Sequence, residues 1–223
     1  MPQFDIVVTD TVAVRGGIPC RFQYAFTSIA NADEAPGIAG DPGIQYALFL
    51  RTGAFPGRGC RRLSIGLSGS SWTSISVPWM SRYPSGKPEM EMAVESEARV
   101  VDTLLVYTIS SSNYTGGAHG MYSINCHNYS IAGGYELALS DLFDAARQEA
   151  LIGLIRNKLY EQFGVTGTKV WWRRDFFPEY ISTTENFEVT EDGITFYYNP
   201  YDIGCYALGG VEVHITREEM QGL

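Results

Sequence analysis

The chain has 223 residues, of which 45% are hydrophobic and 18% charged, a composition that suits one large globular domain or two small ones. Its formal net charge of -9 argues against binding to nucleic acids, because an acidic surface repels phosphates. No run of the chain approaches the roughly 20 apolar residues that a membrane-spanning helix needs. The negative charge maintains solubility and would weakly favour a cationic protein partner.

Two strands are predicted near the N-terminus, because apolar and polar residues alternate over Phe4–Val14 and again over Cys20–Ile29. Pro, Gly, Asn and Asp then crowd together in a loop over Asn31–Gly43. Residues 53–88 are rich in Gly, Ser, Pro and Arg, but they lack the residue order of a phosphate-binding loop.

The change in composition near residues 81–90 predicts a domain boundary. We therefore expect a smaller N-terminal α+β subdomain over residues 1–85 and a second domain over residues 86–223.

An antiparallel hairpin is predicted to open the second domain. Residues Glu89–Ala98 alternate acidic and apolar side chains, which is typical of a strand with one wet and one buried face, and Arg99–Ser110 follows as its partner. Met121–Ile131 is the third strand, and Tyr135–Leu139 is expected to pair back to it.

One long helix is predicted over Asp141–Phe163, where apolar residues recur three and four positions apart. Ser140 or Asp144 can cap its start, and Gly164 its end. The apolar stripe of this helix must cover a sheet, because nothing else nearby in the sequence can bury it.

The C-terminal third is predicted to form a hairpin and one further strand. Phe187–Thr190 and Ile194–Tyr198 flank the turn signal Glu191-Asp192-Gly193, and alternation resumes over Val211–Ile215. A short acidic helical turn is expected from Thr216. The fold class is therefore α+β, with antiparallel sheets and one long amphipathic helix packed on a face.

The stretch Tyr114-Thr115-Gly116-Gly117-Ala118-His119-Gly120 separates two apolar runs. Because glycine loses the most backbone freedom and has no side chain to pack, we expect a tight turn, a bulge or a close backbone approach here. Its binding candidates are Tyr114, Gly116, Gly117 and His119. An imidazole could transfer protons near neutral pH, but no nucleophile or acid lies at a telling spacing, and a hydrogen bond from His119 to nearby backbone is the favoured alternative.

The pair Trp171-Trp172, followed by Arg173, is a second binding candidate, since exposed aromatics with arginine are typical of protein interfaces and of surfaces that bind sugars. The alternative is that these rings cover the core above the helix. No metal site is predicted, because His119 and His127 would lie about 26 Å apart on one strand. No cofactor motif is found.

The chain contains four cysteines without the close spacing of a zinc site or a redox pair. Four cysteines allow three pairings, which the residues alone do not distinguish. Each cysteine is either a small, buried apolar residue or part of a disulfide that forms in an oxidising compartment. The four are Cys20, Cys60, Cys126 and Cys205.

From about residue 100 onward the sequence resembles the DUF3298, or RsiV-like, family. Three blocks carry this resemblance, in an order and spacing that are together fairly specific. They are Tyr114–Gly120, Leu137–Phe143 at the start of the helix, and Asn186–Gly209 with its segment Asp192-Gly193-Ile194-Thr195-Phe196-Tyr197-Tyr198-Asn199-Pro200-Tyr201-Asp202-Ile203. Residues 1–85 occupy the position of a DUF4163-type domain, although they match one poorly.

The resemblance implies an extracytoplasmic α+β binding or sensor module of the cell envelope. Its ligand would be a cell-wall polymer or a wall-active protein such as lysozyme. Its place would be the periplasm or the cell surface, with lipoprotein anchoring through a trimmed leader. A Cys126–Cys205 disulfide would then join the third strand to the C-terminal hairpin. The alternative is a cell-wall-related hydrolase, or a domain associated with deacetylases, that uses His119.

Overall fold

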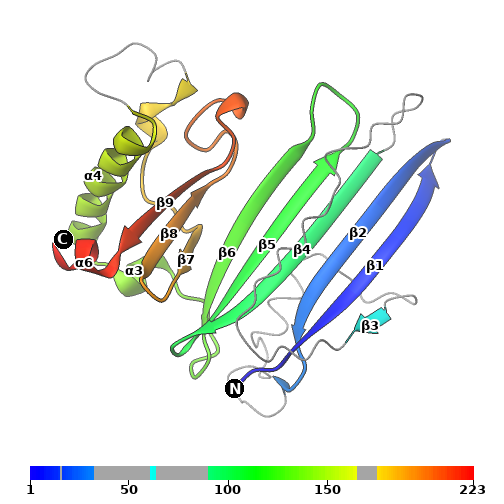
Figure 1. Cartoon of the computed structure of the whole chain (residues 1–223), viewed down its shortest axis with the longest axis horizontal. Helices are drawn as coiled ribbons and strands as arrows, with labels where there is room; N and C mark the ends of the chain where they lie inside the picture. The colour runs from blue at the N-terminus through cyan, green and yellow to red at the C-terminus, as the bar shows by residue number, and fades with distance from the viewer. Residues whose placement is uncertain (16, 33–60, 64–89, 165–174) are drawn as a thin grey trace.

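The computed structural model describes residues 1–15, 17–32, 61–63, 90–164 and 175–223 of the chain. These residues form an α+β fold with a six-stranded sheet, a three-stranded sheet and helices beside the smaller sheet (Figure 1). Within them, no helix is long and apolar enough to cross a membrane.

The larger sheet has the strand order β3-β1-β2-β4-β5-β6, and all its pairs are antiparallel except the parallel pair β2 and β4. Apolar side chains from β2, β5 and β6 meet in one buried cluster that includes Phe26, Leu105, Tyr107 and Tyr129. The strands are β1 Phe4–Arg15, β2 Ile18–Ile29, β3 Arg61–Leu63, β4 Met90–Val101, β5 Leu104–Tyr114 and β6 Met121–Ser130.

The predicted domain boundary between residues 85 and 86 lies outside the described residues, and it stays a prediction. Described strands on its two sides pair directly, since Cys20 to Ala25 of β2 run alongside Met90 to Glu95 of β4. The predicted loop over Asn31–Gly43 also lies almost entirely outside the described residues.

The predicted hairpin of β4 and β5 is present, but its turn was placed too early. The strand continues through Val100 and Val101, and the chain reverses at Asp102, whose φ of 53° is left-handed. Val100 and Val101 are apolar and extend the strand, and an aspartate accepts left-handed backbone more readily than these apolar neighbours do.

The smaller sheet contains β7 Phe187–Val189, β8 Gly193–Tyr198 and β9 Val211–Thr216, in that order. Its strands follow the predicted hairpin and the predicted last strand. Helix α4, Ala145–Gln162, lies along this sheet in Figure 1. Its buried residues Leu151, Ile155 and Leu159 share one core with Phe196 and the apolar residues of β9. The helix therefore covers the smaller sheet, as its apolar stripe requires.

The predicted single helix is in fact two helices, α3 Leu139–Leu142 and α4. The chain is extended at Phe143 and Asp144, and the Asp144 carboxylate accepts a hydrogen bond from the Arg147 amide at 2.9 Å. An N-cap residue needs this non-helical backbone. Asp144, which the sequence predicted as a possible cap, therefore also divides the predicted helix in two. Gly164, with φ of 64°, follows the helix end as predicted.

Two shorter features were also predicted. The chain after β6 pairs back to it, although only through an isolated bridge between Tyr129 and Glu136 and the bonds beside it. Helix α6, Arg217–Gln221, starts at Thr216, whose hydroxyl accepts a hydrogen bond from the Glu219 amide. The remaining short helices are η3 Pro178–Tyr180 and η4 Tyr206–Leu208.

Asparagine side chains join the outer edge of β6 to the smaller sheet. Asn186 accepts a hydrogen bond from the Cys126 amide at 2.8 Å and donates to the carbonyls of Ile124 and Tyr197 at 2.8 and 3.1 Å. Asn199 accepts from the Ile124 amide at 2.7 Å and donates to its carbonyl at 3.0 Å. A carboxamide supplies both a donor and an acceptor, so it can pair with a strand as another strand would.

A third asparagine, Asn128, belongs to β6 itself and is 1% exposed. It donates to the Phe187 carbonyl at 2.8 Å and accepts from the Val189 amide at 3.0 Å. Near the start of β6, the Tyr122 hydroxyl accepts from the Gly210 amide at 2.9 Å. These contacts hold the two sheets in a defined arrangement.

An ion pair lies beside the asparagines. Arg99 of β4 pairs with Glu188 of β7, which is 6% exposed, and Tyr197 donates a hydrogen bond to the same carboxylate at 2.8 Å. Burial and this nearby carboxylate raise the pKa of the Tyr197 hydroxyl, which therefore stays protonated. The interface between the sheets is thus polar, and its charges are paired.

Candidate binding surface

The connection between β5 and β6 turns on two glycines. Gly116 and Gly117 have φ values of 85° and 143°, which side chains other than glycine rarely adopt. The Tyr114 hydroxyl donates to the Gly117 carbonyl at 3.1 Å and closes the turn. The glycine-rich stretch is therefore a turn and not part of a ladder, as the sequence predicted.

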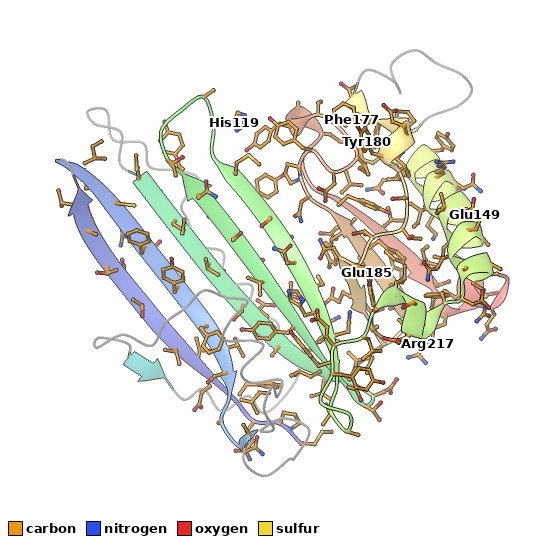
Figure 2. All side chains as sticks on the ribbon, turned by 180° about the vertical axis from the view of Figure 1, so that it is seen from behind. His119, Glu149, Phe177, Tyr180, Glu185 and Arg217 are labelled. Atoms are coloured by element: carbon orange, nitrogen blue, oxygen red, sulfur yellow. The ribbon has the colours of Figure 1, made fainter. Side chains whose placement is uncertain are left out.

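His119 lies exposed after this turn (Figure 2). Its ring stacks on that of Tyr206, with centroids 3.8 Å apart and planes inclined by 18°. Its Nδ1 lies 2.9 Å from the Gly120 carbonyl oxygen, to which the Tyr206 hydroxyl donates at 2.6 Å. One carbonyl thus holds both rings in place, and the imidazole has the hydrogen bond to nearby backbone that was expected as the alternative to catalysis.

Two more tyrosines surround Tyr206. The Tyr201 ring lies 5.6 Å and the Tyr122 ring 6.4 Å from it, measured between centroids. We call His119, Tyr122, Tyr201 and Tyr206 the aromatic surface. Tyr201 is 51% exposed, so the surface presents open ring area to a ligand.

The backbone of Tyr201 is strained, because its φ of 78° is left-handed in a residue that is not glycine. A turn imposes this conformation: the Asp202 carboxylate accepts from the Asn199 amide at 2.7 Å, and the Asp202 amide donates to the Asn199 carbonyl at 3.0 Å. Such strain costs about 1–3 kcal/mol and concentrates at functional sites. It supports a role for the Tyr201 ring outside the core.

The chemical groups that this surface offers are exposed aromatic rings and tyrosine hydroxyls. Within the described residues, the His119 ring contacts the Gly120 carbonyl and Tyr206, neither of which is an acid that could orient an imidazole. The described residues also contain no group of three or more His, Cys, Asp or Glu side chains that could hold a metal ion. Exposed rings with anchored hydroxyls instead suit contacts with a partner's apolar faces.

Comparison with known proteins identifies the C-terminal part of the chain. Residues 140–218 match the model of DUF3298, a family of proteins of unknown function. Residues 140–218 are a DUF3298 domain. No curated protein matches the sequence.

Two solved structures extend the likeness to the whole chain. A DUF3298 family member from Bacteroides fragilis NCTC 9343 is 25% identical, with a TM-score of 0.67, and the alignment covers 100% of this chain and 93% of that one. A DUF3298 family protein from Pseudomonas aeruginosa PAO1 is 16% identical, with a TM-score of 0.63 and coverage of 100% and 94%. The second likeness is one of fold alone.

The aromatic surface combines the DUF3298 domain with the strands that precede it. Tyr201 and Tyr206 lie within the matched residues, whereas His119 and Tyr122 come before them. The asparagines at the edge of β6 hold these two parts together.

Four of the predicted binding residues lie together in the structure at the connection between β5 and β6, namely Tyr114, Gly116, Gly117 and His119. The predicted Trp171, Trp172 and Arg173 lie outside the described residues. No role was predicted from the sequence for the tyrosines around His119. A signal was present in the sequence, because Tyr201 and Tyr206 lie in the turn-rich segment Asn199–Gly209, between the predicted strands, where large rings are not expected to be core residues.

The disulfide between Cys126 and Cys205 is not present. Cys20, Cys126 and Cys205 are free thiols, and Cys60 lies outside the described residues. Cys126 is buried, its Sγ lies 4.0 Å from the hydroxyl of its cross-strand neighbour Thr108, and burial raises the pKa of its thiol to about 12. A buried thiol that holds its proton is a poor nucleophile for disulfide formation.

Proposed function

We propose that this protein is a non-enzymatic binding module of the cell envelope, located outside the cytoplasm, that uses the aromatic surface to recognise its ligand. The observation that carries the proposal is the His119 ring stacked on Tyr206 beside the exposed, strained Tyr201. Aromatic residues dominate binding energy in interfaces because they offer large, rigid contact areas. The DUF3298 domain supports a place in the envelope through its resemblance to sensor proteins.

The ligand class we propose is a cell-wall polymer or a wall-active protein such as lysozyme. The chain's net charge of -9 favours a cationic protein partner through long-range attraction. Sugar rings have apolar faces that pack on tyrosine and histidine rings. Both ligands would need the same exposed rings, so one set of variants tests both.

Calorimetry against soluble peptidoglycan fragments and against lysozyme tests the proposal. Tyr201→Asn removes the exposed ring and keeps a residue that tolerates left-handed backbone, and His119→Ala removes the stacked ring. We expect each variant to bind at least about tenfold more weakly, the size of an interface hot spot. The control is Tyr135→Ala, since Tyr135 is also exposed (56%) but lies outside the aromatic surface.

Absence of binding to both ligands, or equal binding by all variants, would overturn the proposal. The same samples are assayed for turnover of the peptidoglycan fragments. Turnover that disappears in His119→Ala would replace the proposal with a hydrolase that uses His119.

A further inference from the structure

Strand β9 is the outer strand of the smaller sheet, and the pairing pattern shows which of its backbone groups face outward. In β8, the Gly193 carbonyl accepts from Thr190 and the Tyr197 amide donates to the Asn186 carbonyl, so the odd-numbered residues bond on the β7 side. Alternate residues of an antiparallel strand bond to opposite neighbours. The even-numbered residues of β8 therefore bond to β9.

The register pairs those even-numbered residues with Val211, Val213 and Ile215. The amides and carbonyls of Glu212 and His214 consequently point away from β8. Within the described residues they have no backbone partner, because β9 pairs only with β8 there. The next outward amide, at Thr216, is taken by the Glu219 carboxylate at 2.9 Å. Two consecutive outward positions of the strand are thus open with respect to the described part of the chain.

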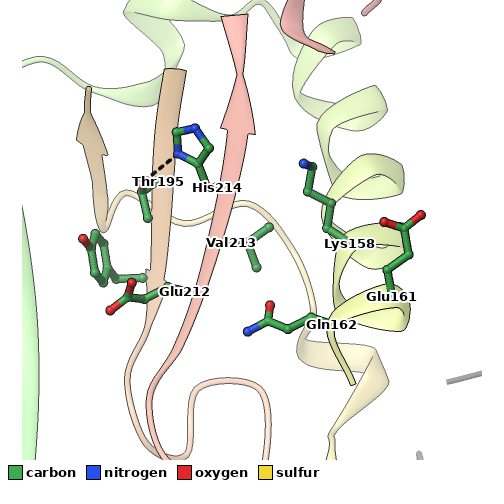
Figure 3. Close-up of a pocket in the computed structure, with 8 residues that line it drawn as sticks. Lys158, Glu161, Gln162, Thr195, Glu212, Val213 and His214 are labelled. Atoms are coloured by element: carbon green, nitrogen blue, oxygen red, sulfur yellow. Dashed lines mark hydrogen bonds between the residues drawn. The ribbon is translucent and has the colours of Figure 1, made fainter. Parts of the chain in front are cut away.

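A groove of about 530 Å³ runs along these open positions, between β9 and the last turns of α4 (Figure 3). Val213 and the buried residues of β9 face the helix, so Glu212 and His214 project from the opposite face of the sheet. The groove therefore passes over the edge of the strand. Its residues are Lys158, Glu161, Gln162, Thr195, Tyr197, Glu212, Val213 and His214.

The groove has unpaired negative charge. Its one lysine, Lys158, is paired with Glu219 at 2.7 Å, and His214 shares a hydrogen bond with the Thr195 hydroxyl at 2.9 Å. Within the described residues, Glu161 and Glu212 have no cation in ion-pair range. They stand on the two sides of the groove, one on the helix and one on the strand.

We propose that this groove binds an extended, dibasic peptide segment of a partner protein, which adds to β9 as a fourth strand. The open backbone groups of Glu212 and His214 would pair with the main chain of the peptide. Adjacent residues of a strand point to opposite faces, so two consecutive lysines or arginines would place one cation near Glu161 and the other near Glu212.

A second copy of this chain does not fit the same groove. Each copy has a net charge of -9, and pairing two β9 edges would bring unpaired carboxylates together. The site is also separate from the aromatic surface, because the two share no residue. The inference does not depend on the proposed function.

The test uses a fluorescent peptide of sequence Thr-Val-Lys-Lys-Val-Thr, capped at both ends, and measures anisotropy with the whole protein. We expect saturable binding that weakens as salt is added. Two control peptides separate the causes: one has Glu-Glu in place of Lys-Lys, and the other keeps the lysines but has N-methyl groups on alternate amides. Both should bind at least tenfold more weakly, the first through charge and the second through lost strand pairing.

The matched protein variants are Glu161→Gln with Glu212→Gln, and, as a control, Glu149→Gln at an exposed position of the same helix. The double variant should weaken binding of the lysine peptide about tenfold or more, and the control should leave it unchanged. Amide chemical shifts of Glu212 and His214 should move on titration. The proposal is overturned if the peptide does not bind, if the N-methylated peptide binds equally well, or if the double variant behaves like the control.

Discussion

The outer edges of β6 and β9 differ in whether other described parts of the protein hydrogen-bond to their backbone groups. Both strands end a sheet within the described residues, and both would expose unpaired amides and carbonyls. The edge of β6 is closed by side chains, mainly the carboxamides of Asn186 and Asn199. Among the residues that the structure describes, none covers the edge of β9 at Glu212 and His214 in this way.

The difference shows how a sheet can be joined to another without a continuous ladder. A third asparagine, Asn128, reaches from β6 to the backbone of β7, so the contacts run in both directions. Each carboxamide satisfies a donor and an acceptor that would otherwise be buried without partners. The edge of β9 faces a groove and not another sheet. Water or a ligand can therefore hydrogen-bond to its outward amides and carbonyls, and no asparagine side chain is required there.

The largest effect is expected from Asn186→Ala. This change leaves the Cys126 amide and the Tyr197 carbonyl without their partner and removes one of the two donors to the Ile124 carbonyl, which keeps its bond from Asn199. Each buried group left unpaired costs about 1–3 kcal/mol. We expect the free energy of unfolding in urea to fall by about 3 kcal/mol. The exposed helical Asn157→Ala serves as the control, and a loss below about 1 kcal/mol in Asn186→Ala would show that the β6 edge is not held by this side chain.

The next effect concerns pH and the buried Cys126 of β6. Its folded-state pKa is raised to about 12, mainly by burial, so its contribution to stability is complete below the unfolded-state pKa of about 8.5. That contribution is lost as pH rises towards 12, by up to about 1.4 kcal/mol per pH unit. Urea unfolding between pH 8 and 11 should therefore show a steeper decline in the parent than in Cys126→Ala. Parallel declines would contradict burial of this thiol.

A smaller effect is expected where Tyr122 closes the start of the β6 edge. Tyr122→Phe keeps the ring beside Tyr206 but removes the acceptor of the Gly210 amide. One neutral hydrogen bond contributes about 1 kcal/mol, so the midpoint of urea unfolding should fall by a corresponding amount. Tyr135→Phe, at an exposed position, is the matched control. An unchanged midpoint would show that solvent replaces this contact.

The smallest effect is expected at the open edge. Glu212→Gln removes an exposed carboxylate without touching the ladder to β8, so the free energy of unfolding should change by no more than about 0.5 kcal/mol. The measurement is the same urea titration. A loss comparable to that of Asn186→Ala would mean that the β9 edge is closed by contacts of its own, and the contrast between the two edges would disappear.

Much of the fold could be predicted because the spacing of apolar residues along each segment matches the face that the segment buries. The alternation in Val211, Val213 and Ile215 predicts the buried face of β9, and the apolar stripe with Leu151 and Ile155 predicts a helix on a sheet. The break at Asp144 could not be predicted from periodicity, since the stripe continues through it. The turn at Asp102 was missed for a similar reason, because alternation does not reveal where a strand ends.

The sequence by itself determined the strands, the main helix and the glycine turn before His119, because spacing of apolar residues and backbone freedom are local properties. Only the tertiary structure decided that Tyr206 stacks on His119 and that Asn186 and Asn199 pair with β6. These partners are separated by at least 60 residues. A polar or aromatic side chain has the same local pattern whether it meets solvent or a distant strand, so its partner is set by how the sheets pack.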